Sequence, residues 1–176
     1  MSSMPTWSKA TYSSGKLSGG ALLDLHIHDT DFVQFLFGRP QSVFSAGVQR
    51  SKDSIDHVVT QYNYPGGPAV YAEGGWLLFG NFNMSYTVLC ERATLDYDLS
   101  RGADALVITE QGKAPRVIKS AGGDGYLGEI SYMLEAVLSG KAPKVVTARD
   151  GLSAVEICEA EAKSVKTGKV VPVSRS

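Results

Sequence analysis

The stretch that decides the fold reads Ser18-Gly-Gly-Ala-Leu-Leu-Asp-Leu-His-Ile-His-Asp-Thr-Asp-Phe-Val-Gln-Phe-Leu-Phe-Gly38. Ser18 is suited to the N-cap of a helix, and Gly38 just before Pro40 is suited to its end. Between them, apolar residues recur at helical spacing at positions 22, 25, 32 and 36. The pattern predicts a helix over residues 19–37.

This helix concentrates groups that can carry protons. It holds two of the three histidines of the chain and three aspartates, within an otherwise apolar segment. Residues four apart share one face of a helix, so Asp24 and His28 are expected to stack, and Asp31 continues that face. His26 lies about 200° round the helix from His28 and is expected to point away.

Three interpretations of the segment remain open from the residues alone. Asp24-Leu-His26-Ile-His28 has the Asp-x-His-x-His spacing of a metal site, but that spacing needs a strand and further ligands. A buried histidine held by an aspartate one turn earlier would have no chemical role. In the third interpretation, Asp24 orients and tunes His28 as an acid/base pair.

The bulk properties exclude several classes of function. With 176 residues and a net charge of −1, the chain has the length of one domain and no electrostatic case for nucleic acid or an anionic membrane. The N-terminus lacks a signal-peptide core, and no apolar run has membrane length. Cys90 and Cys158 occur in apolar contexts, which predicts free, buried thiols in a reducing compartment. We expect a soluble, cytoplasmic protein.

The remainder of the chain alternates between strands and helices. Strands are predicted over residues 42–50, 57–64, 69–73, 84–90, 93–98, 105–109 and 116–119, with turns at 65–68 and 110–115. Helices are predicted over 126–138 and from a capping box at Thr147 to Gly168, before a short strand at 170–173. Short connections between sequential strands favour an antiparallel meander. The predicted fold is α+β: a mostly antiparallel, open sheet of about six or more strands with helices packed on one face. Residues 1–17 form an irregular lead-in to a single domain over 18–176.

Aromatic residues lie along these strands, among them Tyr62, Tyr71 and Trp76. A carbohydrate site requires rings of this kind for stacking, and Trp76 is our candidate for substrate binding. A half-buried sheet face would be equally rich in aromatics without any ligand.

The head of the chain closely resembles the C-terminal domain of the glucose–fructose oxidoreductase/inositol dehydrogenase (Gfo/Idh/MocA) family. The matching pattern is Gly19-Gly20, Asp24, His28, Asp31 and Gly38. The resemblance implies that His28 exchanges a proton with a sugar hydroxyl, that Asp24 assists it and that Asp31 contributes to substrate binding. His26 departs from the family pattern, which usually has a small residue, often glycine, at that position.

We expect this chain to lack the parts of such an enzyme that would bind the dinucleotide. Gly15, Gly19 and Gly20 make no Gly-x-Gly-x-x-Gly motif and follow no predicted strand, and the Glu-Lys-Pro segment with the family's catalytic lysine is missing. The resemblance therefore implies the substrate-binding and oligomerisation half of an NAD(P)-dependent sugar or polyol dehydrogenase, inactive alone. NAD or NADP would require a separate Rossmann domain, and the sheet face would form a homo-oligomer. The alternative is a stand-alone, non-catalytic sugar-binding or dimerisation module.

Overall fold

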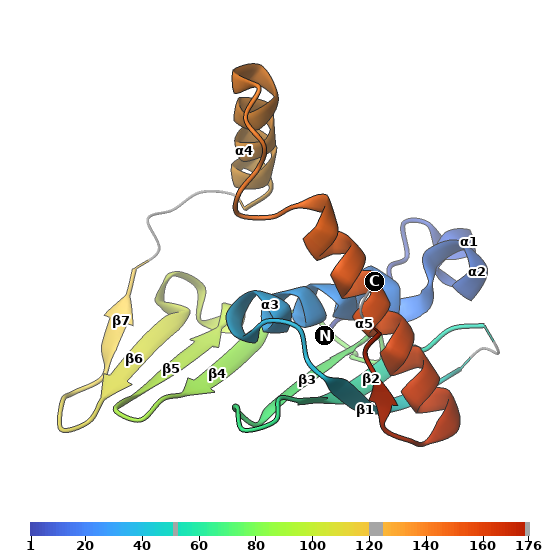
Figure 1. Cartoon of the computed structure of the whole chain (residues 1–176), viewed down its shortest axis with the longest axis horizontal. Helices are drawn as coiled ribbons and strands as arrows, with labels where there is room; N and C mark the ends of the chain where they lie inside the picture. The colour runs from blue at the N-terminus through green and yellow to red at the C-terminus, as the bar shows by residue number, and fades with distance from the viewer. Residues whose placement is uncertain (51–52, 120–124, 175–176) are drawn as a thin grey trace. The chain divides into compact units, whose positions relative to one another are not determined.

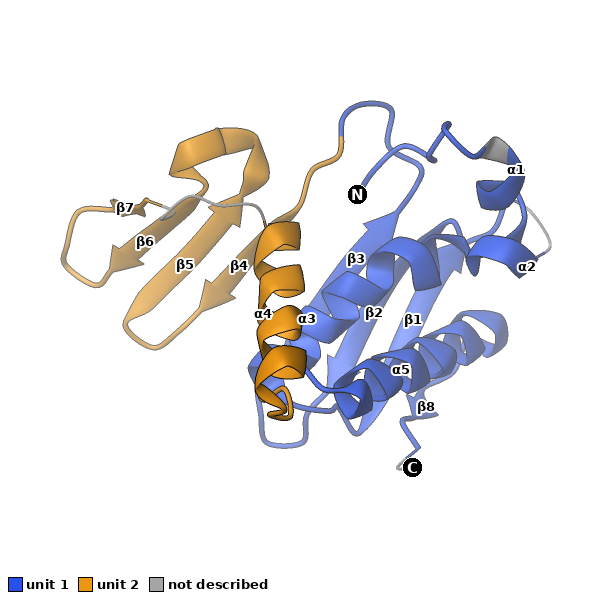
Figure 2. Cartoon of the chain, turned by 90° about the horizontal axis from the view of Figure 1, so that it is seen from above, with its two compact units in different colours: residues 1–81, 146–176 blue, residues 82–145 orange. Residues whose placement is uncertain are grey.

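The computed structural model describes residues 1–50, 53–119 and 125–174 (Figure 1). The chain divides into two compact units, Met1–Asn81 with Val146–Ser176, and Phe82–Val145 (Figure 2). The single domain predicted over residues 18–176 stays a prediction, since the two units are described separately. None of the helices in the described part of the chain is long and apolar enough to cross a membrane.

The first unit contains a four-stranded antiparallel sheet and most of the helices. Its helices are α1 (Lys9–Tyr12), α2 (Gly15–Ser18), the π-helix η1 (Leu22–His26), α3 (Ile27–Phe37) and α5 (Ala148–Thr167). Its strands are β1 (Ser42–Val48), β2 (His57–Asn63), β3 (Val70–Gly75) and β8 (Val171–Pro172), in the order β3-β2-β1-β8. The lead-in expected to be irregular thus contains two single-turn helices, and α2 ends because Gly19 takes the left-handed conformation.

Alternation along the strands decides which face of this sheet is covered. Val58, Thr60 and Tyr62 of β2 are buried, whereas Val59 and Gln61 between them are exposed. Such alternation is typical of an antiparallel sheet with one face on the core and one in water. Helices α3 and α5 lie over the buried face (Figure 2). The core between these layers contains Val33, Val43, Tyr62, Val70, Ile157, Ala160, Val171 and Val173.

Helix α5 begins and ends as its sequence predicts. Thr147 and Asp150 form a complete capping box: the Thr147 backbone N–H donates to Asp150 Oδ2 at 2.7 Å, and the Asp150 N–H donates to Thr147 Oγ1 at 3.3 Å. The Thr147 hydroxyl, which donates to Asp150 Oδ2 at 2.7 Å, and the Thr147 N–H lower the pKa of Asp150, since both favour its carboxylate form. Gly168, left-handed at φ 65°, closes the helix.

The second unit is a meander of β4 (Ser85–Leu89), β5 (Ala93–Asp98), β6 (Leu106–Glu110) and β7 (Arg116–Ile118). A 3-10 helix, Leu99–Asp104, connects β5 to β6, and α4 (Gly125–Ser139) follows the sheet. Tyr86 and Tyr97 are directly opposite in the β4–β5 register and stack with their ring centroids 5.0 Å apart.

The predicted class, α+β with mostly antiparallel open sheet, is confirmed. The strands divide between two four-stranded sheets, where the sequence indicated one sheet of about six or more strands. The division falls in residues 76–84, where Trp76-Leu-Leu-Phe-Gly-Asn-Phe-Asn-Met contains no tight turn to join β3 to β4 as a hairpin. The alternation of apolar and polar residues along a strand predicts that it pairs with a neighbouring strand. It cannot show where one sheet ends and the next begins.

Candidate active site

The candidate site starts with a glycine pair that lets the helix begin against a loop. Gly19 and Gly20 have φ values of 76° and 73°. A Cβ at Gly20 would lie 2.8 Å from Ser54 Cβ and 2.9 Å from the Ile55 carbonyl oxygen, so a side chain there would collide with the loop. Leu22 N–H then donates to Ile55 O at 3.3 Å. This close approach fixes the start of the helix that carries Asp24 and His28.

The predicted helix over 19–37 forms, but its first part is a π-helix. Asp24 lies within the π turn Leu22–His26, and His28 lies in the first turn of α3. Asp24 is half-buried and His28 is exposed. The exposed imidazole meets the first requirement of a general acid or base, which is that it can reach a substrate hydroxyl.

The charges of Asp24 and His28 influence each other, and their role as an acid/base pair stays a prediction. Partial burial raises the pKa of the Asp24 carboxyl, and the positive charge of protonated His28 lowers it again. The Tyr12 hydroxyl also belongs to this group, since the pKa of Tyr12 is raised by desolvation and by the Asp24 charge. Tyr12 of α1 was not identified from sequence, because a tyrosine in a Ser-rich segment carries no pattern.

An aromatic group adjoins this side of the helix. The Tyr12 ring lies edge-on to Trp7, with centroids 5.0 Å apart, and edge-on to Trp76, at 5.6 Å. Trp7 is 80% exposed, whereas Trp76 is only 2% exposed. The structure thus places Trp76 beneath Tyr12, and its assignment to substrate binding stays a prediction.

Asp31, the remaining candidate, is half-buried on α3. Its Oδ1 accepts a hydrogen bond of 3.3 Å from Gln34 Nε2, which also donates to the Asp150 carbonyl at 3.1 Å. Gln34 therefore links Asp31 to the start of α5. The role of Asp31 in substrate binding also stays a prediction.

His26 points into the protein, on the side opposite to His28. Its side chain is fully buried, with Nε2 3.5 Å from Glu161 Oε2 of α5 and Nδ1 3.3 Å from Asp29 Oδ2. Burial alone would lower the pKa of His26, but the interactions with Asp29 and Glu161 raise it to about 9. The sequence indicated that His26 turns away from His28, but not what it meets. The available signal for this partner was Glu161, a charged residue that lies on the apolar stripe of α5 three residues after Cys158.

The geometry does not support the metal interpretation. Asp24, His26 and His28 lie on a helix, where the alternate residues of Asp-x-His-x-His do not share a face. Across residues 1–50, 53–119 and 125–174, no three His, Cys, Asp or Glu side chains are grouped so that they could hold a metal ion.

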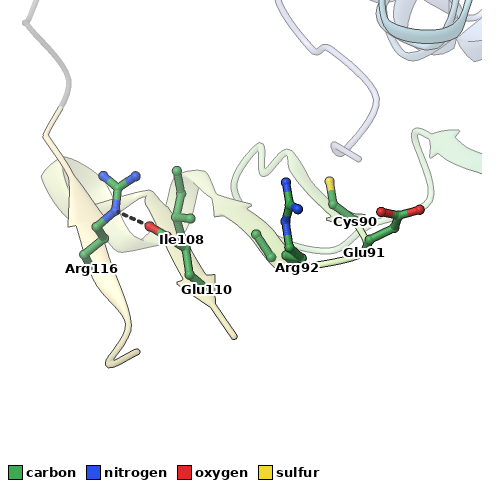
Figure 3. Close-up of a pocket in the computed structure, with 7 residues that line it drawn as sticks. Cys90, Glu91, Arg92, Ile108, Glu110 and Arg116 are labelled. Carbon is green, nitrogen blue, oxygen red and sulfur yellow. Dashed lines mark hydrogen bonds and ion pairs between the residues drawn. The ribbon is translucent and has the colours of Figure 1, made fainter. Parts of the chain in front are cut away.

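A shallow hollow of about 510 Å³ lies in the second unit (Figure 3). It is lined by Cys90, Glu91, Arg92, Ala93, Ile108, Glu110 and Arg116. Arg116 Nε and Glu110 Oε1 form an ion pair at 3.4 Å within it. Cys90 is exposed, so the prediction that both thiols are buried was wrong for this residue. Cys90 follows the end of β4 at a hairpin turn, where neighbouring apolar residues do not imply a core position.

The described geometry is that of an α+β domain with open antiparallel sheets, whose helical segment carries Asp24 and His28. The sequence model of the GFO/IDH/MocA C-terminal domain matches residues 2–96. The chain belongs to this family. A search of curated proteins gave no match.

Solved structures share the fold over most of the chain. A putative oxidoreductase, yvaA from Bacillus subtilis, is 24% identical with a TM-score of 0.71, covering 88% of this chain and 51% of its own. A levoglucosan dehydrogenase in complex with NADH and levoglucosan is 18% identical with a TM-score of 0.78, covering 96% and 56%. The UDP-N-acetylglucosamine 3-dehydrogenase GnnA from Acidithiobacillus ferrooxidans is 17% identical with a TM-score of 0.76, covering 94% and 51%. The chain spans about half the length of these structures.

Proposed function

We propose that this chain is the substrate-binding half of an NAD(P)-dependent sugar or polyol dehydrogenase, with His28 as general acid/base and Asp24 as its partner. The observation that carries the proposal is the placement of half-buried Asp24 and exposed His28 four residues apart on one helical segment. Family membership supports it, as do the sugar dehydrogenases among the structures that share the fold.

This chain would perform the proton half of the reaction. Oxidation of a secondary alcohol to a ketone removes the hydroxyl proton and a hydride from the adjacent carbon. His28 would accept the proton and become an imidazolium, and the Asp24 carboxylate would stabilise that charge. In reduction of the ketone the same imidazolium would return the proton to the oxygen.

The substrate would be held by groups around this pair. The Asp31 carboxylate can accept hydrogen bonds from sugar hydroxyls. Tyr12 and exposed Trp7 offer aromatic surface, and Trp76 would contribute by supporting the Tyr12 ring from below. A sugar or polyol is therefore the class of substrate that we propose.

Gly15 and Gly20, at the head of the chain, do not fit a dinucleotide-binding loop. A Cβ at Gly15 would lie 1.9 Å from the Asp53 carbonyl oxygen, and one at Gly20 would meet Ser54 and Ile55. These glycines approach the chain's own backbone and leave no space for a pyrophosphate. We place NAD or NADP on a separate Rossmann domain, as family membership suggests, and assign no hydride step to this chain. Calorimetric titration of the chain alone with NADH is expected to give no micromolar binding.

A second candidate function, a non-catalytic sugar-binding or dimerisation module, is favoured by the open face of the first sheet. Phe44, Val48, Val59 and Tyr71 point away from the helices and are exposed. Gln61 of β2 lies between Phe44 and Tyr71 in the strand register, so these side chains form a continuous surface. We propose that this surface pairs with a second copy of the chain. One chain could serve both as the dehydrogenase half and as a dimerisation module.

The cytoplasmic location of the protein also stays a prediction.

The test of the dehydrogenase proposal is turnover after a His28→Gln substitution, measured with a nucleotide-binding domain supplied in cis or in trans. We expect a loss of about 10²-fold or more, since general acid–base catalysis contributes about that much. His57→Gln is the matched control, because His57 pairs with Glu73 on the sheet at 3.2 Å. Unchanged turnover in folded His28→Gln protein would contradict the proposal.

A further inference from the structure

We propose that His26, held by Glu161 of α5, is a positioning residue that sets the relation between Asp24 and His28. The inference rests on the proposed function, because it concerns the same acid/base pair. Its evidence is the geometry of the buried face of the helix. Its test is a titration of Asp24, which can be measured without substrate.

The pair spans a junction between two kinds of helix. Asp24 belongs to the π turn Leu22–His26, whereas His28 belongs to the α-helix that begins at Ile27. A π turn contains more residues than an α-helical turn, and each α-helical residue advances by about 100°. If the junction moved by one residue, Asp24 would rotate by about that angle relative to His28. The relation between the two side chains therefore depends on where the π turn ends.

His26 is the last residue of the π turn, and its side chain is anchored to two other elements. Its Nε2 lies 3.5 Å from Glu161 Oε2 on α5 and 3.3 Å from the Tyr62 hydroxyl on β2. Its Nδ1 lies 3.3 Å from Asp29 Oδ2, one turn further along the helix. At the junction itself, the His26 ring is thus hydrogen-bonded at Nε2 to the Tyr62 hydroxyl and lies within ion-pair distance of Asp29 and Glu161.

The anchor is itself held in place by a second ring of contacts. Thr30 Oγ1 donates to Glu161 Oε1 at 3.2 Å and lies 3.0 Å from the Tyr62 hydroxyl. The Cys158 thiol lies 3.8 Å from the same Thr30 oxygen. All four of these side chains are buried, so the position of the Glu161 carboxylate is determined by packing and hydrogen bonds together.

Gly74 of β3 lies directly against the His26 imidazole, where a side chain would not fit. A Cβ at Gly74 of β3 would lie 2.8 Å from His26 Nδ1 and 2.9 Å from Asp29 Oδ2. Any larger residue at this position would push against the His26–Asp29 contact. The backbone of β3 therefore completes the enclosure of the imidazole.

The test measures how strongly His28 influences the Asp24 carboxyl, using NMR of the labelled side chain. Since protonated His28 lowers the pKa of Asp24, His28→Gln is expected to raise it in the otherwise natural protein. We expect the change in Asp24 proton affinity to be about two- to fivefold, typical of an exposed ion pair. In a Glu161→Gln background, which keeps the shape but removes the charge, we expect the effect to fall below about 1.5-fold.

Two further variants keep the test decisive. Glu73→Gln removes the partner of the other histidine–glutamate pair, at His57, and is expected to leave the Asp24–His28 interaction unchanged. If Glu161→Gln does not fold, His26→Leu/Glu161→Leu replaces both charges by apolar groups, a change that folded proteins often tolerate. A full-sized effect of His28→Gln on Asp24 in either folded background would overturn the positioning role.

The outcome separates this inference from the proposed function. If Glu161→Gln abolishes the Asp24–His28 interaction but His28→Gln retains full turnover in the complete enzyme, only the dehydrogenase role fails. If His28→Gln abolishes turnover while Glu161→Gln leaves the interaction intact, only the positioning role fails.

Discussion

His26 Nε2 and Glu161 Oε2 lie 3.5 Å apart, and neither side chain has any exposed surface. The pair connects the end of the π turn to α5 within the first unit. A buried charge without its partner is strongly destabilising. The protonation of His26 should therefore be linked to the stability of the fold.

The first prediction is a loss of stability at alkaline pH. The pKa of His26 is about 9 in the folded chain, against about 6.5 when unfolded. Its contribution is fully present below about pH 6.5 and is lost as the pH rises through about 9. Each tenfold change in proton affinity is worth about 1.4 kcal/mol, so the linked contribution is roughly 3 kcal/mol.

Urea unfolding between pH 6 and pH 10 measures this dependence. The His26→Leu/Glu161→Leu variant should lose the part of the dependence that is centred near pH 9. Equal stability of the natural chain at pH 6 and pH 10 would show that His26 does not carry a buried charge.

The second prediction concerns the glycine pair at the start of the helix. Gly20→Ala is expected to lower the free energy of unfolding by roughly 2–4 kcal/mol, since the left-handed backbone and the collision with Ile55 O both add to the cost. Gly66→Ala is the matched control, because Gly66 has a similar φ of 70° with no atom within 4 Å of the new Cβ. It should cost only about 1–2 kcal/mol. Chemical denaturation measures both variants. Similar losses in the free energy of unfolding would argue against the close approach of Gly20 to the Ile55 carbonyl.

The third prediction distinguishes the two thiols. Cys90 is exposed, whereas Cys158 is buried and desolvation, with the nearby Glu161 charge, raises its pKa. The thiolate is the reactive form, so a disulfide reagent should titrate one thiol in the native protein and two after unfolding. Cys90→Ser should remove the fast-reacting thiol. Two fast-reacting thiols in native protein would contradict the burial of Cys158.

The fourth prediction tests the proposed pairing surface. Tyr71 is 77% exposed on the outer face of the sheet, so Tyr71→Glu should not disturb the core. If this face joins two copies, sedimentation should show the natural chain as a dimer or larger oligomer and Tyr71→Glu as a monomer. Leu17→Glu, at an exposed apolar position on α2, is the control. A natural chain that is monomeric over a wide concentration range would count against the surface.

Much of the fold could be predicted from the sequence because its signals are local. Thr147 and Asp150 are three residues apart and cap α5 as expected, and the turn at residues 65–68 joins β2 to β3. The spacing of Asp24 and His28 placed both on one helical segment, as the structure has them, while their role as a pair stays a prediction. In each case the residues that decide the structure are close neighbours in the chain.

The remainder depends on contacts between distant residues. The π turn at Leu22–His26 has no signature in a sequence that also fits an α-helix. The partners of His26 come from residues 62 and 161, which no spacing rule connects to it. The position of Tyr12 beside Asp24 arises from packing of the lead-in, whose sequence has no periodicity.

The central claim is that Asp24 and His28 act as one acid/base unit, and a double-mutant cycle on turnover tests it most directly. Asp24→Asn, His28→Gln and the double variant are compared in the enzyme completed by a nucleotide-binding domain. Residues that act as a unit have non-additive effects. We predict that His28→Gln lowers turnover by about 10²-fold or more and that adding Asp24→Asn lowers it little further. Losses that multiply in the double variant, or unchanged turnover in folded His28→Gln protein, would contradict the claim.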